Sequence, residues 1–447
     1  MMIRNDNLGV TSIIRALGMR DNYDALIDYF RSDAWELRTL EYNWWQFVSE
    51  NAPLVRYNGA VILVGDGSKV NKEGRRMPGV KRLHQESEDS SKADTIWGQM
   101  YGCVGVLADA GDKTFCIPLA CELHDGVKEI LSWDEVYGYR QGSHTVELMS
   151  LAHHTAKVFQ KTILLLDRYY LTEPALERLQ AFNAGGKVMD AIIMAKSNVI
   201  AYEKPDKRNA NTRGRPSKKG RSIKLATLFE TDAADFVQCE VEMYGKNTVV
   251  RYLVKDLIWG RTINRMLRFV LVEFGERRVI IAATDTGLGP DAIIELYAKR
   301  FSIECTFKTM KHDVAAFSNR FWSKSMPILD RYAKSSDEDR AKSVKSEHDR
   351  KNVRKSLDAT EGYVFCGVVA TGLLQTLSML YINNVAKRHL RYQRTLSRTA
   401  ASEATVSEFL AKNLFRLLPN ADDLTICKII HEKMAVNDSF MLEFNTG

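Results

Sequence analysis

Two short runs of apolar residues, each followed closely by an aspartate, constrain most strongly what this 447-residue chain can fold into. The first run, Val61 to Val64, precedes Asp66 in GAVILVGDGSK, and the second precedes Asp167 in KTILLLDRYY. Such short apolar runs are typical of strands buried on both faces of an α/β sheet. Because ligands bind at the carboxyl ends of these strands, the two aspartates are candidate site residues. Taken singly, each would more often cap a turn or a helix.

The segments around these runs predict an alternating order of strands and helices. After the Asp66 strand, the chain predicts a hairpin that turns at Gly111-Asp112. His144 to Phe159 has helical periodicity, and a second helix is expected to open at Thr172-Glu173-Pro174, where a capping residue precedes a first-turn proline. Val188 to Ala195 predicts another buried strand. The order is strand, strand, strand, helix, strand, helix, strand, which indicates an α/β fold.

A third carboxylate lies in YAKRFSIECTFKTMK, where Tyr297, Arg300, Glu304 and Lys311 follow at steps of three, four and seven residues. On one helix these steps place all four side chains along a single stripe. A carboxylate between two cations and a phenol is poor core material. It suits a site where Glu304 holds a divalent cation while Arg300 and Lys311 hold phosphates. The alternative is a solvated helix with Arg–Glu pairing four residues apart.

This spacing resembles the Y-R-E-K signature of bacterial insertion-sequence DD-E transposases, the superfamily named after insertion sequence four, and the resemblance covers roughly residues 1 to 385. It implies an α/β fold in which a ribonuclease H-like catalytic core is interrupted by an antiparallel β-rich insertion, with helical N- and C-terminal regions. It also implies that Asp66, Asp167 and Glu304 bind two Mg²⁺ ions, with Mn²⁺ as a substitute, for phosphoryl transfer. In the same scheme Arg300 and Lys311 hold DNA phosphates, and Tyr297 positions DNA or packs the helix.

The resemblance and the order of elements predict five regions. They are an N-terminal helical region at 1–52 that is a candidate for DNA-end binding, the first part of the core at 53–196, a basic loop and β-rich insertion at 197–290, the second part of the core at 291–385, and a C-terminal helical region at 386–447. The C-terminal helices could serve dimerisation or DNA-end binding, and the sequence leaves both open.

Two features of the insertion are candidates for DNA contact. The segment from Lys204 to Lys224 holds nine Lys or Arg against the single Asp206, while the net charge of the whole chain is +7. Such a run is either a solvated loop or an electrostatic footprint for nucleic acid. Four of its cations are the predicted DNA contacts and are called the four loop cations below: Arg213, Arg215, Lys218 and Lys219.

Trp259, in VKDLIWGRT, is the second of these features. Related transposases that form hairpin DNA ends stack an aromatic residue of the insertion on a flipped base, and Trp259 is the candidate here. A tryptophan packed in the sheet is the competing interpretation.

The predicted function is that of a DD-E transposase, a Mg²⁺-dependent endonuclease and strand transferase. Its partners would be double-stranded DNA, as transposon inverted-repeat ends and target, and a second copy of the chain in the DNA complex. Two alternatives remain: a metal-dependent nuclease of the same fold that cuts without joining, and a non-catalytic DNA-binding descendant of a transposase. Asp190 and Asp109 are the next candidates should one of the three carboxylates be misassigned.

Cysteine content and hydropathy predict a cytoplasmic protein without a membrane span, and the resemblance implies that it is bacterial and associated with the nucleoid. The seven cysteines form no CxxC pair and are scattered, which is typical of a reduced cytosolic chain. Cys116, Cys121 and His124 are a weak metal-site candidate. Tyr363 to Ile382 is twenty residues without a charge, and a buried helix is favoured there over a membrane helix.

Overall fold

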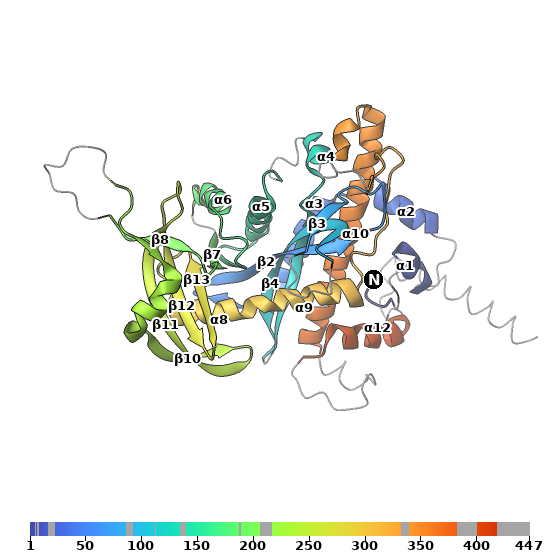
Figure 1. Ribbon diagram of the computed structural model, residues 1–447. Helices are drawn as coiled ribbons and strands as arrows, with labels where there is room; N and C mark the ends of the chain where they lie inside the picture. The colour runs from blue at the N-terminus through green and yellow to red at the C-terminus, as the bar shows by residue number, and fades with distance from the viewer. Residues whose placement is uncertain are drawn as a thin grey trace, which may run out of the picture.

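The computed structural model describes residues 1–4, 6, 9–16, 23–85, 93–111, 113–134, 140–186, 189–205, 217–331, 339–381 and 400–417. It has a mixed α/β architecture in which one large mixed sheet runs through the molecule and helices lie at both ends of the chain (Figure 1). The strands are β1 (Arg56–Tyr57), β2 (Ala60–Asn71), β3 (Lys81–His84), β4 (Thr95–Asp109), β5 (Thr114–Leu123), β6 (Thr162–Leu166), β7 (Met189–Met194), β8 (Ile200–Tyr202), β9 (Ser222–Lys224), β10 (Val237–Met243), β11 (Lys246–Trp259), β12 (Arg265–Phe274) and β13 (Arg277–Ala283).

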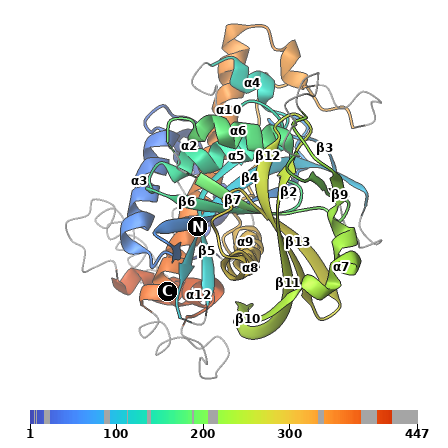
Figure 2. The ribbon, with the colours of Figure 1, turned by 90° about the vertical axis from the view of Figure 1, so that its left-hand side faces the viewer.

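The helices surround this sheet. They are α1 (Val10–Ala16), α2 (Tyr23–Arg31), α3 (Leu37–Asn51), α4 (Lys128–Ser132), α5 (His144–Ala156), α6 (Glu173–Asn183), α7 (Leu228–Thr231), α8 (Pro290–Ala298), α9 (Ser302–Lys308), α10 (Glu347–Leu380) and α12 (Glu403–Leu417), with short 3₁₀ turns at Leu225–Thr227, Ala233–Asp235, Lys299–Phe301 and Arg340–Ser343 and a π-helical turn at Thr309–Asp313. Figures 1 and 2 agree that α5 and α6 lie on one face of the sheet while α8 and α9 lie on the other.

Five strands form the part of the sheet that carries the predicted aspartates. Their spatial order is β5-β4-β2-β6-β7, in which β5, β4 and β2 are antiparallel neighbours and β2, β6 and β7 run parallel. The apolar runs that end before Asp66 and Asp167 are buried and lie side by side in β2 and β6. The predicted sequence of strands, hairpin and helices is therefore observed, with the small strands β1 and β3 and the short helix α4 added.

The insertion is antiparallel, as the resemblance implies. β10 and β11 form a hairpin, and β12 and β13 form another that turns at Gly275-Glu276. The first hairpin turns at Tyr244-Gly245, and both residues have positive φ, as a two-residue primed turn requires. β13 also pairs with β7, so the insertion extends the core sheet directly.

Helix α10 contains residues 363–380 of the uncharged stretch that runs from Tyr363 to Ile382. It packs on β5 and against α2, α3 and α12. In the described part of the chain it is the one helix long and apolar enough to cross a membrane, and 67% of its apolar window is buried within the protein. The favoured interpretation of this stretch as a buried helix is confirmed, although the helix starts much earlier, at Glu347.

A buried ion-pair network joins α10 to the sheet. The Arg140 guanidinium donates to both carboxylate oxygens of Glu361, at 2.7 and 3.0 Å, and its Nε lies 3.4 Å from Glu122 of β5. Arg140, Glu122 and Glu361 are each at most 3% exposed. Because a buried charge is stable only when it is paired, these contacts fix the position of α10 on β5.

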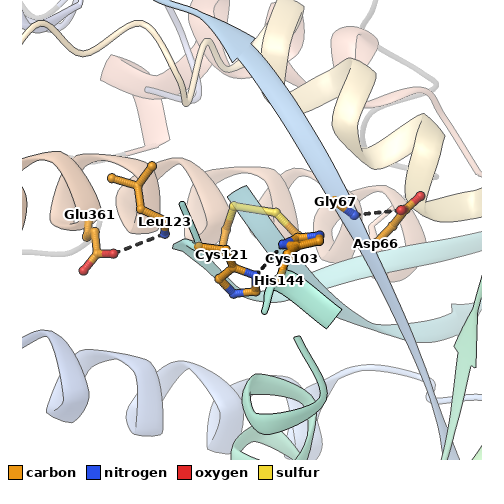
Figure 3. Close-up of a disulfide and its surroundings, with 8 residues drawn as sticks. Asp66, Gly67, Cys103, Cys121, Leu123, His144 and Glu361 are labelled. Atoms are coloured by element: carbon orange, nitrogen blue, oxygen red, sulfur yellow. Dashed lines mark hydrogen bonds between the residues drawn. A yellow bond between two sulfur atoms is a disulfide. The ribbon is translucent and has the colours of Figure 1, made fainter. Parts of the chain in front are cut away.

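Cys103 and Cys121 form a disulfide between β4 and β5 (Figure 3). The two residues are 18 positions apart in sequence and directly opposite in the hairpin register. This corrects the expectation of a fully reduced chain, because the hairpin brings together two cysteines whose spacing gives no signal of pairing. It also removes Cys121 from the weak metal-site candidate, and Cys116 is buried as a free thiol.

Candidate active site

The register of β2 and β6 explains how Asp66 and Asp167 come together. The last parallel pair is Val64 opposite Leu165. Asp66 lies two residues after Val64, and Asp167 lies two residues after Leu165. Because side chains two residues apart point to the same face of a strand, both carboxylates emerge on one side at adjacent places. Contrary to expectation, Asp66 is not at the end of its strand, because β2 continues to Asn71 through pairing with β4. Only the parallel part of β2 ends before Asp66.

The segment that carries the third carboxylate is not one regular α-helix. Tyr297 is in the last turn of α8, Arg300 is in the 3₁₀ turn, Glu304 is in α9, and Lys311 is in the π-helical turn. The single stripe expected from regular spacing is therefore wrong in detail. Departures of this kind re-aim side chains locally and are frequent at functional sites.

Arg300 joins two of the predicted carboxylates. Its Nη1 donates to Oδ2 of Asp66 at 3.1 Å, and its Nη2 donates to Oε1 of Glu304 at 2.7 Å. The Arg–Glu pair four residues apart that a solvated helix would show is thus present. A solvated helix would not show the contact between Arg300 and Asp66, because this contact joins the helical segment to β2, 234 residues earlier in the sequence. The side chains of Arg300, Asp66 and Glu304 are 14%, 20% and 44% exposed, so the cluster opens to solvent at Glu304.

Electrostatics place Asp167, Tyr297 and Lys311 in the same cluster. Burial raises the pKa of Asp66 to about 6, Arg300 opposes that rise, and the negative charge of Asp167 adds to it. Burial lowers the pKa of Lys311, and Asp66 opposes this effect. Burial raises the pKa of Tyr297, with Arg300 opposing and the two aspartates reinforcing the rise. Each of the six predicted residues of the core site therefore interacts with Asp66, with Arg300 or with both.

A polar layer behind the aspartates is not predicted by the sequence. His144, the first residue of α5, lies 2.9 Å from the Tyr170 hydroxyl through Nε2 and 2.9 Å from His124 through Nδ1. Tyr170 is 2% exposed, and burial followed by the charges of Asp66 and Asp167 raises its pKa. The only hint in the sequence is the position of Tyr170, three residues after Asp167 in DRYY.

Gly67 separates this layer from Asp66. A Cβ atom at Gly67 would lie 2.8 Å from Nε2 of His144, so a side chain there would displace the imidazole. Its backbone N–H donates to Oδ1 of Asp66 at 2.7 Å (Figure 3). The glycine thus permits close approach of α5 to β2 and at the same time orients the carboxylate.

The donor chemistry of the cluster fits a divalent cation. Among the described ranges, no group of three or more His, Cys, Asp or Glu side chains is already arranged as a metal site. Instead the Arg300 guanidinium lies between Asp66 and Glu304 and supplies the positive charge that these carboxylates require. Carboxylate oxygens are the ligands that Mg²⁺ prefers, and Asp66 and Asp167 repel each other without a cation.

The two reserve aspartates lie outside this cluster. Asp109, at the far end of β4, pairs with Lys299 at 3.1 Å. Asp190 accepts a hydrogen bond from Thr284 and is level with Ile163 of β6, near the opposite end of that strand from Asp167. The geometry therefore favours Asp66, Asp167 and Glu304 over either replacement.

The predicted DNA contacts of the insertion differ from one another in how far they are buried. Trp259 is half-buried and packs against the core, and the adjacent Gly260 carbonyl accepts from Lys219 at 2.6 Å. Lys218 is exposed. Arg213 and Arg215 lie outside the described residues. The contact of Trp259 with the core favours the packed interpretation, and its base-stacking role stays a prediction.

Comparison with protein-family models, with curated proteins and with solved structures gave no match. The resemblance based on the Y-R-E-K spacing therefore stays a prediction. Any functional conclusion rests on the residues of this chain and their arrangement.

Proposed function

We propose that the protein is a Mg²⁺-dependent DD-E transposase that cleaves DNA strands at transposon ends and joins them to target DNA. The observation that carries the proposal is the Asp66–Arg300–Glu304 cluster beside Asp167. It assembles three carboxylates and two cations from two parallel strands and one irregular helical segment. An isolated surface ion pair joins only two side chains, whereas charged groups gathered from several elements are typical of functional sites.

The strand arrangement supports a ribonuclease H-like core. In chain order the main strands are β2, β4, β5, β6 and β7, so Asp66 lies on the first and Asp167 directly follows the fourth. The order β5-β4-β2-β6-β7, with the first three strands antiparallel and the last two parallel to β2, is typical of that fold. The antiparallel insertion between Asp167 and Glu304 fits a transposase better than a simple nuclease.

In the proposed mechanism Asp66, Asp167 and Glu304 would hold the metal ions. Bound Mg²⁺ would activate an oxygen nucleophile and stabilise the departing 3′-oxygen. The planar guanidinium of Arg300, which donates to Asp66 and Glu304 in this structure, is suited to hold a phosphate in two contacts. Lys311 provides a second positive charge close to Asp66. Tyr170, hydrogen-bonded to His144, lies close enough to the two aspartates that their charges help to raise the pKa of its hydroxyl.

The test compares DNA cleavage by Asp66→Asn, Asp167→Asn and Glu304→Gln with that of the parent protein. Each protein is incubated with the DNA that flanks its own coding region, in Mg²⁺ and in EDTA, and 3′ and 5′ products are mapped. All three variants should lose cleavage while DNA binding stays within about two-fold, because the basic surface is unchanged.

Asp109→Asn is the matched control, because it also removes one partner of an Asp–cation pair on the same sheet. It should cleave normally. Near-normal cleavage by any of the three variants would show that the residue is misassigned. Cleavage without joined products would favour the nuclease alternative, and binding without cleavage by the parent protein would favour the non-catalytic one.

A further inference from the structure

A groove of about 760 Å³ lies beyond the carboxylate cluster, along the continuation of β2. One wall is residues 71–77, which follow β2, and the other comes from residues 317–328, which follow the π-helical turn. Asp66 and Asn71 are five residues apart on one strand, which corresponds to about 17 Å. The two chain segments that carry Asp66 and Glu304 therefore meet again at this groove.

The walls are held together by cations that donate to backbone carbonyls. The buried Lys72 ammonium donates to the carbonyls of Phe317 at 2.5 Å and Asn319 at 2.8 Å. Arg76 donates to the carbonyl of Met326 at 3.1 Å, and Arg331 donates to that of Glu73 at 2.5 Å. Because a carbonyl is neutral, these bonds fix the groove without cancelling the positive charge of its arginines. Burial lowers the pKa of Lys72 to about 7, so the argument for a phosphate ligand rests on Arg75, Arg76 and Arg320.

Two further cations of the groove are available to a ligand. Arg75 and Arg320 are exposed, and within the described ranges their guanidinium groups make no hydrogen bond or ion pair. Glu73 is the one acidic residue in the lining, against Lys72, Arg75, Arg76 and Arg320. An unpaired arginine in a groove with excess positive charge is suited to a phosphate.

The groove also exposes an aromatic face. The Trp322 side chain lines it and is 47% exposed, and Ile328 beside it is 57% exposed. Trp322 stacks on no other ring in the described part of the chain. Cations that follow a backbone, together with an unstacked aromatic ring, are the features by which proteins bind single-stranded nucleic acid. In a duplex both faces of a base are already stacked, so the ring can act only on an unpaired base.

We propose that this groove binds an unpaired DNA strand next to the scissile phosphate, with phosphates on Arg75 and Arg320 and a base stacked on Trp322. The inference deepens the proposed function and rests on it, since cleavage at the carboxylate cluster would create a strand end whose last base pairs can open. It assigns the stacking role to Trp322, in the core, and not to Trp259, in the insertion.

The experiment measures binding of a fluorescent oligodeoxythymidylate by anisotropy, in EDTA and over a series of salt concentrations. Trp322→Ala should weaken binding on the order of 5- to 150-fold and leave the salt dependence unchanged, because stacking involves no counterion release. The double variant Arg75→Ala/Arg320→Ala should lower the log–log salt slope by about 1.4, since each phosphate contact on a single strand contributes about 0.7.

Matched controls lie elsewhere on the surface. Tyr42→Ala removes another aromatic residue, 52% exposed on α3, and Lys246→Ala/Arg277→Ala removes two exposed cations at the hairpin tips of the insertion. Both controls should bind as the parent does. Trp322→Phe should recover most of the affinity, which separates loss of stacking from loss of folding.

The inference is overturned if Trp322→Ala binds the oligonucleotide as tightly as the parent protein. It is also overturned if the groove variants weaken binding of a fully paired duplex as much as that of the single strand. Because the assay contains no Mg²⁺, it is independent of cleavage. Normal binding by the groove variants alongside Asp66-dependent cleavage would defeat this inference alone, whereas a groove effect in a protein that never cleaves would defeat the proposed function.

Discussion

Asp66→Asn should make the metal-free protein more stable at neutral pH, although it removes a predicted ligand. The folded-state pKa of Asp66 is raised by burial from its ordinary value of 3.8 to about 6. Between about pH 4 and pH 6 the Asp66 carboxyl binds a proton more often in the folded protein than in the unfolded chain. The free energy of unfolding therefore falls as the pH rises through this range. Above pH 6 the cost of keeping Asp66 ionised in the fold is fully present.

The size of this effect follows from the pKa difference. A difference of about two corresponds to about 3 kcal/mol at pH 7, because each factor of ten in proton affinity is 1.36 kcal/mol. An asparagine is neutral at every pH and avoids this cost. For 447 residues the unfolding entropy is about 0.9 kcal/mol/K, so the gain corresponds to an increase of about 3 °C in the melting temperature.

The assay is thermal unfolding of parent and Asp66→Asn proteins in EDTA at pH 7.5 and pH 3.5. The variant should melt higher at pH 7.5, and the difference should vanish at pH 3.5, where Asp66 is protonated in both states. Adding Mg²⁺ at ten times its dissociation constant should stabilise the parent by about 1.4 kcal/mol and the variant by much less. A variant that melts at or below the parent temperature at pH 7.5 would refute the reasoning, because Asp66 would then be stabilised as an ion by Arg300.

Three further predictions concern other parts of the molecule. Replacing the four loop cations by Ala should reduce the log–log salt slope of duplex binding by about 0.9 for each phosphate that the variant no longer binds, and an unchanged slope would indicate a solvated loop. Trp259→Ala should reduce thermal stability with both steps of cleavage intact, because Trp259 packs against the core. A stable variant that fails only at the second-strand step would instead show that Trp259 is the stacking residue. Glu361→Gln should lower the free energy of unfolding by about 3–5 kcal/mol in urea titrations, because it removes the carboxylate that pairs with both Nη atoms of the buried Arg140. Glu230→Gln, which removes one partner of the exposed pair Glu230–Arg278, should leave the unfolding curve unchanged.

The features that the sequence predicts well are those that depend on neighbours in the chain. The apolar runs before Asp66 and Asp167, the hairpins and the opening of α6 at Thr172 all follow from local pattern, and the structure contains them. The break in the Tyr297–Lys311 segment does not follow from pattern, because regular helical spacing is also satisfied by an unbroken helix. Packing against β2 and β5 accompanies the irregular turns.

The rest of the site depends on contacts between distant parts of the chain. His144 and Tyr170 lie 26 residues apart, Arg140 and Glu361 lie 221 apart, and Cys103 meets Cys121 only through the hairpin register. The groove at Trp322 joins segments about 250 residues apart in the sequence. A single sequence contains no signal for such pairs, so only the assembled sheet reveals them.

The hydrogen bonding of β13 to β7 has a mechanical consequence for the whole molecule. Ile281, Ala282 and Ala283 pair with β7, and β7 pairs with β6. The insertion and the strand that precedes Asp167 therefore belong to one continuous sheet. Continuous strand pairing, and not a flexible linker, therefore connects the insertion to the strand that precedes Asp167. Cutting out residues 197–290 would leave β7 as a bare sheet edge, which favours aggregation. Isolated fragments of this protein should therefore be designed to keep β13 with β7.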